Sequence, residues 1–177
     1  TYGSIKESDN LVVVDDSIVR GTTLQKSILK ILDRLNPKKI IIVSSAPQIR
    51  YPDCYGIDMA RMEDFIAFRA ALELIKEKKT DLLEQTYKDC INELKLPNIK
   101  MKNKVKAIYE NFSDDEISQK IAQILKEKTI NADINVIFQT VESLHESCPK
   151  NLGDWYFTGN YPTPGGNRVV NQAFVNF

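Results

Sequence analysis

Two adjacent carboxylates, Asp15 and Asp16, open a short run of small and hydroxyl-bearing residues that ends at Thr23. Carboxylate oxygens bind Mg²⁺ and accept hydrogen bonds from sugar hydroxyls. Side-chain hydroxyls and the free N–H groups at the start of a helix bind phosphate. These residue types therefore predict a ligand with a phosphate at one end and with hydroxyls or a metal at the other.

The elements on either side of this run are those that could position it. Residues 11–14 are an unbroken apolar run rich in β-branched residues, which predicts a parallel strand covered on both faces. Apolar residues at helical spacing then predict a helix over 22–36, stopped by Pro37, and residues 39–46 predict a second strand. The carboxylates would lie at the carboxyl end of the first strand, where open α/β sheets bind ligands.

A simpler interpretation of the two carboxylates is a helix cap or turn that binds nothing. We would favour it for an isolated Asp-Asp-Ser, whereas the surrounding strand, loop and helix favour a binding site. The chain has no Gly-Lys-Ser/Thr sequence, which excludes the phosphate loop of nucleoside triphosphatases.

The run VVDDSIVRGTT, residues 13–23, resembles the phosphoribosylpyrophosphate (PRPP) motif of type I phosphoribosyltransferases. In detail it is most similar to the motif of the amidophosphoribosyltransferase family. Two later blocks resemble the same family in the same order: APQIR with YGID, residues 46–58, and FTGNYPT, residues 157–163. The resemblance implies an α/β fold that is part of a type I phosphoribosyltransferase, Rossmann-like with a mainly parallel sheet.

The family makes 5-phosphoribosylamine from PRPP and glutamine-derived ammonia, in the first step of purine nucleotide synthesis. The resemblance implies that Asp15 and Asp16 bind Mg²⁺ and the ribose hydroxyls. The expected PRPP-binding residues are Asp15, Asp16, Ser17, Ile18, Val19, Arg20, Gly21, Thr22 and Thr23. No catalytic residue is expected in this chain, because the family's glutamine-hydrolysing cysteine lies upstream of the motif.

We predict three segments: a core with the PRPP motif at 1–78, a helical insertion at 79–131, and a last core strand, short helix and turn-rich docking tail at 132–177. Only about three strands are visible, fewer than the five of a complete core. We therefore expect the C-terminal part of a longer chain, with little activity alone. The resemblance further implies glutamine bound by an upstream domain, purine nucleotides as possible feedback inhibitors and a homo-oligomer.

Some members of the family hold an iron–sulfur cluster, but the cysteines here do not fit one. Two of the ligand positions are occupied by Gly153 and Tyr156, and Cys54 is one residue out of register. Cys90 and Cys148 have no metal-ligand spacing. We expect Mg²⁺ and no cluster. Few, widely spaced cysteines also favour a reducing, cytoplasmic setting.

Composition excludes several classes of partner. The 24 basic and 24 acidic side chains balance, so no overall charge favours nucleic acid or membrane.

Arg50 is expected to contact a ligand anion or to pair with Asp53 or Asp58. Two alternatives stay open: a non-catalytic, nucleotide-binding regulatory module with this fold, and a type I phosphoribosyltransferase acting on a free base.

Overall fold

The computed structural model describes residues 3–54, 59–151 and 153–177. Its centre is a sheet of three parallel strands in the order β1 (Asn10–Asp15), β2 (Lys39–Ser44) and β3 (Asp133–Phe138). All three strands arise from runs rich in β-branched residues, which favour a pleated, packed backbone. The α/β fold class predicted from the sequence is confirmed.

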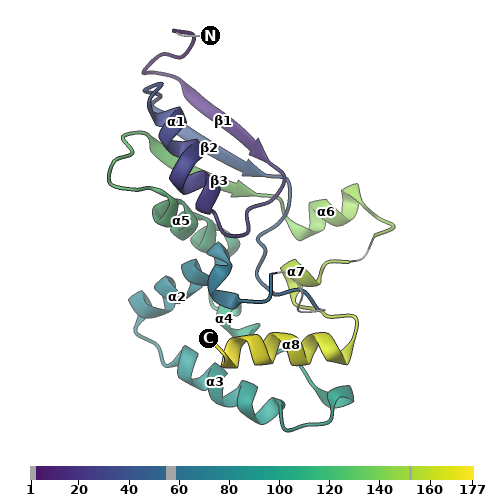
Figure 1. The fold of residues 1–177 in the computed structure, drawn as a ribbon. Helices are drawn as coiled ribbons and strands as arrows, with labels where there is room; N and C mark the ends of the chain where they lie inside the picture. Colours follow the sequence, from purple (N-terminus) through teal and green to yellow (C-terminus); the bar gives the residue numbers. More distant parts are fainter. Residues whose placement is uncertain (1–2, 55–58, 152) are drawn as a thin grey trace.

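Helices lie beside and below the sheet (Figure 1). α5 packs against both β3 and α2, while α3 packs against α8 in a second, wholly helical part. None of the helices in the described residues is long and apolar enough to cross a membrane. The helices are α1 (Leu29–Asp33), α2 (Ile66–Lys78), α3 (Leu82–Glu93), α4 (Ala107–Glu110), α5 (Asp114–Leu125), α6 (Val141–Ser147), α7 (Trp155–Thr158) and α8 (Pro164–Val175).

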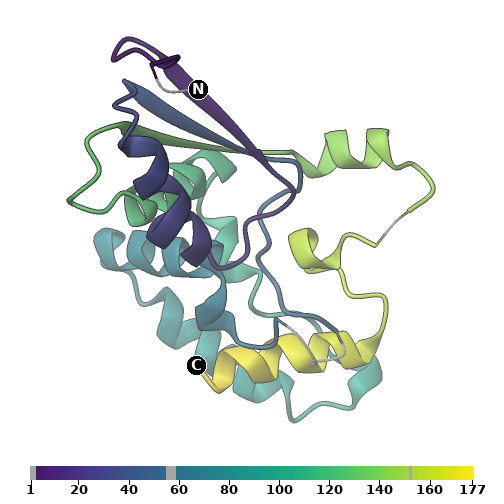
Figure 2. The same cartoon turned by 45° about the horizontal axis from the view of Figure 1, so that its top comes forward.

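The two faces of the sheet differ in burial. Ile40 and Ile42 of β2 are fully buried on the face that the helices cover. On the opposite face Val12 and Val14 of β1 are 61% and 70% exposed. Figure 2 shows the helices gathered on one side of the strands. The prediction that the first strand is covered on both faces is therefore wrong for the part of the chain described.

The helix after the motif is shorter and less regular than the predicted 22–36. It contains a π-helical turn, Leu24–Ile28, followed by α1. A π turn adds a residue to the helical repeat and so rotates the following side chains around the axis. Accordingly, Leu24 and Leu29 are buried, whereas Ile31, an apolar residue within the predicted helix, is 60% exposed.

Residues 79–131 contribute to the core through α5. A capping box begins α5: the Glu116 N–H donates to Ser113 Oγ at 3.2 Å, and the Ser113 N–H donates to a Glu116 carboxylate oxygen at 2.7 Å. Ile117 and Ile121 are fully buried in the core of the molecule. The division into core and insertion stays a prediction.

The C-terminal segment is helical, which corrects the predicted turn-rich tail. Thr163 caps α8 by accepting a hydrogen bond from the Gly166 N–H at 3.3 Å, and Pro164 occupies the first helical position. Proline fits there because its ring pre-sets φ and the missing N–H has no partner in a first turn. Val170 and Phe174 are then buried, and α8 packs against α3.

Candidate functional site

A cavity of about 480 Å³ lies at the carboxyl end of β1. Except for Asp16, every residue of the predicted site lines it. The lining residues are Asp15, Ser17, Ile18, Val19, Arg20, Gly21, Thr22, Thr23, Leu24, Ile28 and Met59. The strand ends at Asp15 and the next helix begins just after Thr23, so the loop between them forms the cavity wall.

The two carboxylates hold the turn after β1. Asp15 Oδ1 accepts the Asp16 N–H at 3.1 Å, and Asp16 Oδ1 accepts the Ser17 N–H at 2.7 Å. These are the bonds expected of a turn cluster. The second oxygen of each carboxylate accepts no hydrogen bond from the described residues. Asp15 is half-buried and faces the cavity, while Asp16 is exposed beside it.

In this loop, backbone carbonyl groups and backbone N–H groups differ in their hydrogen bonding. The carbonyls of Val19, Arg20 and Gly21 each accept a hydrogen bond. By contrast, the N–H groups of residues 18–21 donate to no acceptor within the described part of the chain. A run of free backbone N–H groups beside a helix start is an anion-binding concavity. The hydroxyls of Thr22 and Thr23 lie at that helix start.

Contacts to the start of α2 hold this loop. The Ile66 N–H donates to the Val19 carbonyl at 2.8 Å, and Arg69 Nη2 donates to the Arg20 carbonyl at 2.7 Å. The Arg20 guanidinium also pairs with Asp64 at 3.2 Å, although its side chain is half exposed. A surface pair of this kind adds little stability. The two bonds to the loop carbonyls are therefore the contacts that define its shape.

A metal at this site would rely on few protein ligands. The described residues contain no group of three or more His, Cys, Asp or Glu side chains placed to hold a metal ion. Two adjacent carboxylates nevertheless suit Mg²⁺, which keeps several waters and commonly takes one or two carboxylates together with substrate oxygens. The residues present thus fit a magnesium ion that arrives with its substrate.

Sequence reasoning missed three residues of the cavity wall. Leu24 and Ile28 line it from the π-helical turn, although apolar residues at helical spacing are typical of packing positions. Met59, in a left-handed conformation with φ 51°, lines it directly after the Tyr-Gly-Ile-Asp block, which lies outside the described residues. No sequence signal singles out Met59.

Arg50 lies outside this cavity and has a structural role. Its guanidinium forms an ion pair with Asp114 at the start of α5 and donates to Gln48 Oε1 at 2.7 Å. It also lies over the Tyr109 ring, 5.3 Å from the centroid. The predicted pairing with Asp53 is wrong, since Asp53 accepts a hydrogen bond from Tyr156 instead; Asp58 lies outside the described residues.

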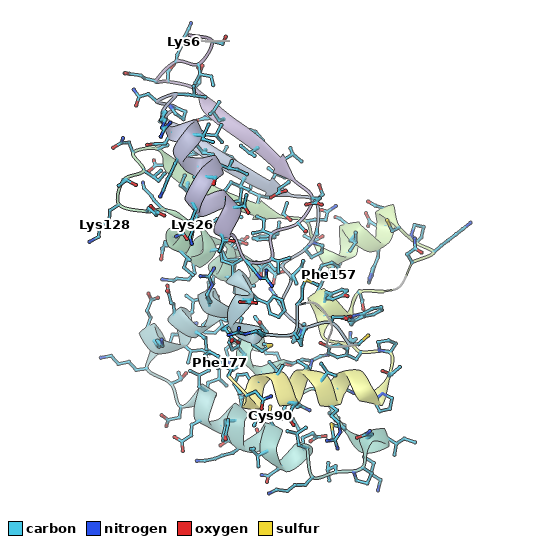
Figure 3. The ribbon with its side chains drawn as sticks, viewed as in Figure 1. Lys6, Lys26, Cys90, Lys128, Phe157 and Phe177 are labelled. Atoms are coloured by element: carbon cyan, nitrogen blue, oxygen red, sulfur yellow. The ribbon has the colours of Figure 1, made fainter. Side chains whose placement is uncertain are left out.

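The three cysteines occupy different environments and form no disulfide. Cys90 is buried between α3 and α8, 3.5 Å from Asn171 Oδ1 (Figure 3), and burial raises the pKa of its thiol to about 12. Cys54 is half-buried and Cys148 is exposed. The thiols therefore differ in accessibility.

Curated relatives match a part of the chain. The amidophosphoribosyltransferase of Haemophilus influenzae is 46% identical over 68 residues, which is 38% of this chain and 13% of the relative. The corresponding proteins of Escherichia coli and Schizosaccharomyces pombe are 36% and 35% identical over 91 and 85 residues. The chain is related to the amidophosphoribosyltransferases. It spans only 13–18% of the length of these three relatives.

No family model matches the chain. The relationship to amidophosphoribosyltransferases therefore rests on the relatives just named. Those relatives are phosphoribosyltransferases by name, and a parallel sheet with helices beside it agrees with that family's α/β fold.

Proposed function

We propose that this chain is the C-terminal portion of the phosphoribosyltransferase domain of an amidophosphoribosyltransferase. The complete enzyme would make 5-phosphoribosylamine from PRPP and glutamine-derived ammonia, in the first step of purine nucleotide synthesis. One observation carries the proposal: in the loop after β1 the carbonyls of Val19, Arg20 and Gly21 accept hydrogen bonds, whereas the N–H groups of residues 18–21 have no acceptor among the described residues. This arrangement suits a phosphate group.

Each part of the loop has a role in this proposal. Residues 17–23 surround the 5-phosphate with backbone N–H groups and hydroxyls. Asp15 and Asp16 accept the ribose hydroxyls and hold Mg²⁺ together with oxygens of the substrate. Breaking the bond from the anomeric carbon to pyrophosphate builds positive charge on the ribose, which fixed carboxylates stabilise. When bound, Mg²⁺ supplies charge to offset that of the pyrophosphate.

We further propose that the site is completed by upstream chain. The chain spans 13–18% of its relatives, and one face of its sheet carries the exposed side chains of Val12, Val14 and Ile137. The upstream part would cover this face, bind pyrophosphate and supply the glutamine-hydrolysing domain. Feedback by purine nucleotides, assembly into a homo-oligomer and a cytoplasmic location belong to the same proposal.

The decisive experiment replaces Asp15 and Asp16 by asparagine in the full-length protein. We expect the kcat/KM for PRPP to fall by about a hundredfold or more, because both carboxylates act on the reacting ribose. Thermal stability should change little, since neither side chain is buried. Asp81→Asn, an exposed residue before α3 whose side chain caps nothing, is the matched control. Unchanged turnover in the double variant would exclude the enzymatic role.

The same variant separates the enzyme from the non-catalytic regulatory module. A regulatory module would keep its partner function and show only altered affinity for nucleotides. A second assay tests whether this chain contains a complete active site: the isolated chain is mixed with Mg²⁺, PRPP and glutamine. Robust turnover there would contradict the proposal that upstream residues are needed. Turnover with a free base in place of glutamine would favour another type I phosphoribosyltransferase.

A further inference from the structure

Arg69 is the one side chain outside the loop that bonds to the backbone of residues 18–21 in the described part of the chain. It lies on the same side of α2 as Ile66, one helical turn away. Its Nη2 atom donates to the Arg20 carbonyl at 2.7 Å. Its Nε atom is buried and has no hydrogen-bond partner among the described residues. Burying a guanidinium N–H without a hydrogen-bond partner costs folding free energy. We therefore expect this side chain to perform a function in its observed position.

The geometry of the peptide bond suggests that role. In a trans peptide the C=O of one residue and the N–H of the next point in opposite directions, and the described chain contains no cis peptide. The bond from the Ile66 N–H to the Val19 carbonyl therefore turns the Arg20 N–H away from α2. In the same way, the bond from Arg69 to the Arg20 carbonyl turns the Gly21 N–H away from α2.

We propose that Arg69 is a positioning residue for the phosphate-binding loop. By holding the Arg20 carbonyl it aims the Gly21 N–H at the cavity, where the 5-phosphate of the substrate binds. This inference rests on the proposed function. In this proposal α2 holds the loop in a fixed position. The helix can do so because its residues Ile66 and Phe68 are buried in the core.

The first test measures ligands separately with the full-length protein. In Arg69→Met we expect the affinity for ribose 5-phosphate to fall about tenfold, the equivalent of one hydrogen bond to a charged group, with the affinity for pyrophosphate unchanged. The KM for PRPP should rise by a similar factor while kcat stays within about twofold, because the phosphate is held equally in the ground and transition states. Arg61→Met is the matched control, since Arg61 is exposed and pairs with Glu63 instead of the loop.

The second test needs no ligand. Amide hydrogen exchange at Ile66 should accelerate in Arg69→Met, because a loop released from Arg69 also loosens its bond to Ile66. Exchange at Ile75, on the same helix and fully buried, should stay unchanged. Equal acceleration at both amides would show general destabilisation and overturn the proposal.

The ligand measurements distinguish a failure of the positioning role of Arg69 from a failure of the proposed function. Equal weakening of ribose 5-phosphate and pyrophosphate, or no weakening of either, would overturn the positioning role while leaving the proposed function intact. A wild-type protein that fails to bind ribose 5-phosphate would instead overturn the proposed function, and the role of Arg69 in phosphate binding with it.

Discussion

Gly21 of the phosphate loop lies directly against Ile66, the first residue of α2. A Cβ atom at Gly21 would come within 2.5 Å of Ile66 Cδ1, and within 3.0 Å of Leu125 Cδ2 on α5. The φ of Gly21 is 70°, in the left-handed region that favours glycine. Loop, α2 and α5 thus meet at a point that has no room for a side chain.

Gly21→Ala is therefore expected to reduce the free energy of unfolding by about 1–3 kcal/mol, through backbone strain and the contact with Ile66. It should also weaken ribose 5-phosphate binding. Denaturant unfolding and calorimetry measure the two effects. Gly165→Ala is the control, because the nearest atom to its Cβ, Thr163 Oγ1, is 3.8 Å away. Equal stability of the two variants would refute the packing argument.

Asn171 on α8 is expected to be the strongest polar contributor to the helical part. It is fully buried, donates to the Lys102 carbonyl at 2.8 Å and accepts the Lys104 N–H at 3.0 Å. Asn171→Ala leaves both backbone groups without a partner and should cost about 2–4 kcal/mol of unfolding free energy, as measured by urea denaturation. Asn131→Ala, at an exposed side chain, should cost less than about 0.5 kcal/mol. Similar losses would contradict this assignment.

Stability should depend on pH through the capping box of α5. Hydrogen bonds from the Ser113 backbone and hydroxyl hold the pKa of Glu116 below its usual 4.5, with a further contribution from Lys78. A carboxyl group with a lowered folded-state pKa stabilises the fold above its unfolded pKa, and this contribution disappears as the pH falls through the folded pKa.

Wild type should therefore exceed Glu116→Gln in unfolding free energy at neutral pH, and the excess should shrink as the pH is lowered below about 4.5. Urea unfolding at a series of pH values measures the difference. A difference that stays constant from neutral pH down to pH 3 would rule out this contribution.

Thiol labelling should report on the packing of α3 against α8. Only the thiolate reacts, and burial raises the pKa of Cys90 to about 12. We expect an aromatic disulfide reagent at pH 8 to modify the exposed Cys148 rapidly and Cys90 only after unfolding. Cys148→Ser should remove the fast phase. A buried Cys90 that reacts as fast as Cys148 in the native protein would disprove the packing described.

Local patterns allowed most elements to be predicted, whereas long-range contacts did not follow from them. The capping box is a pattern of residues close together in the chain, so Ser113 and Glu116 alone are enough to predict where α5 begins. Arg50 was expected to contact a ligand anion or to pair with Asp53 or Asp58. It pairs with Asp114 instead, which the sequence gives no reason to choose. The burial of each face of β1 depends on which elements pack against it, and an apolar run alone does not identify those elements.

The same distinction between local patterns and long-range contacts holds for the candidate site. The motif predicted the residues of the loop, because strand, carboxylates and helix start are contiguous in the chain. Met59 and Arg69 approach it from later segments, and no pattern pointed to either. The C-terminal helix was missed because Pro164 followed by two glycines is typical of a turn, although proline is equally suited to a first helical position.

The order of strands in the sheet has a consequence for how the molecule forms. β1 and β2 are separated by a short helical connection, so their pairing is nearly local. Lys39 of β2, however, lies beside Asp133 of β3, and four α-helices intervene between these strands along the described chain. Contacts between such distant segments form late, because the chain must first close a long loop. On the ribosome, the edge of β2 that faces β3 therefore stays unpaired until all of these helices and β3 itself have emerged.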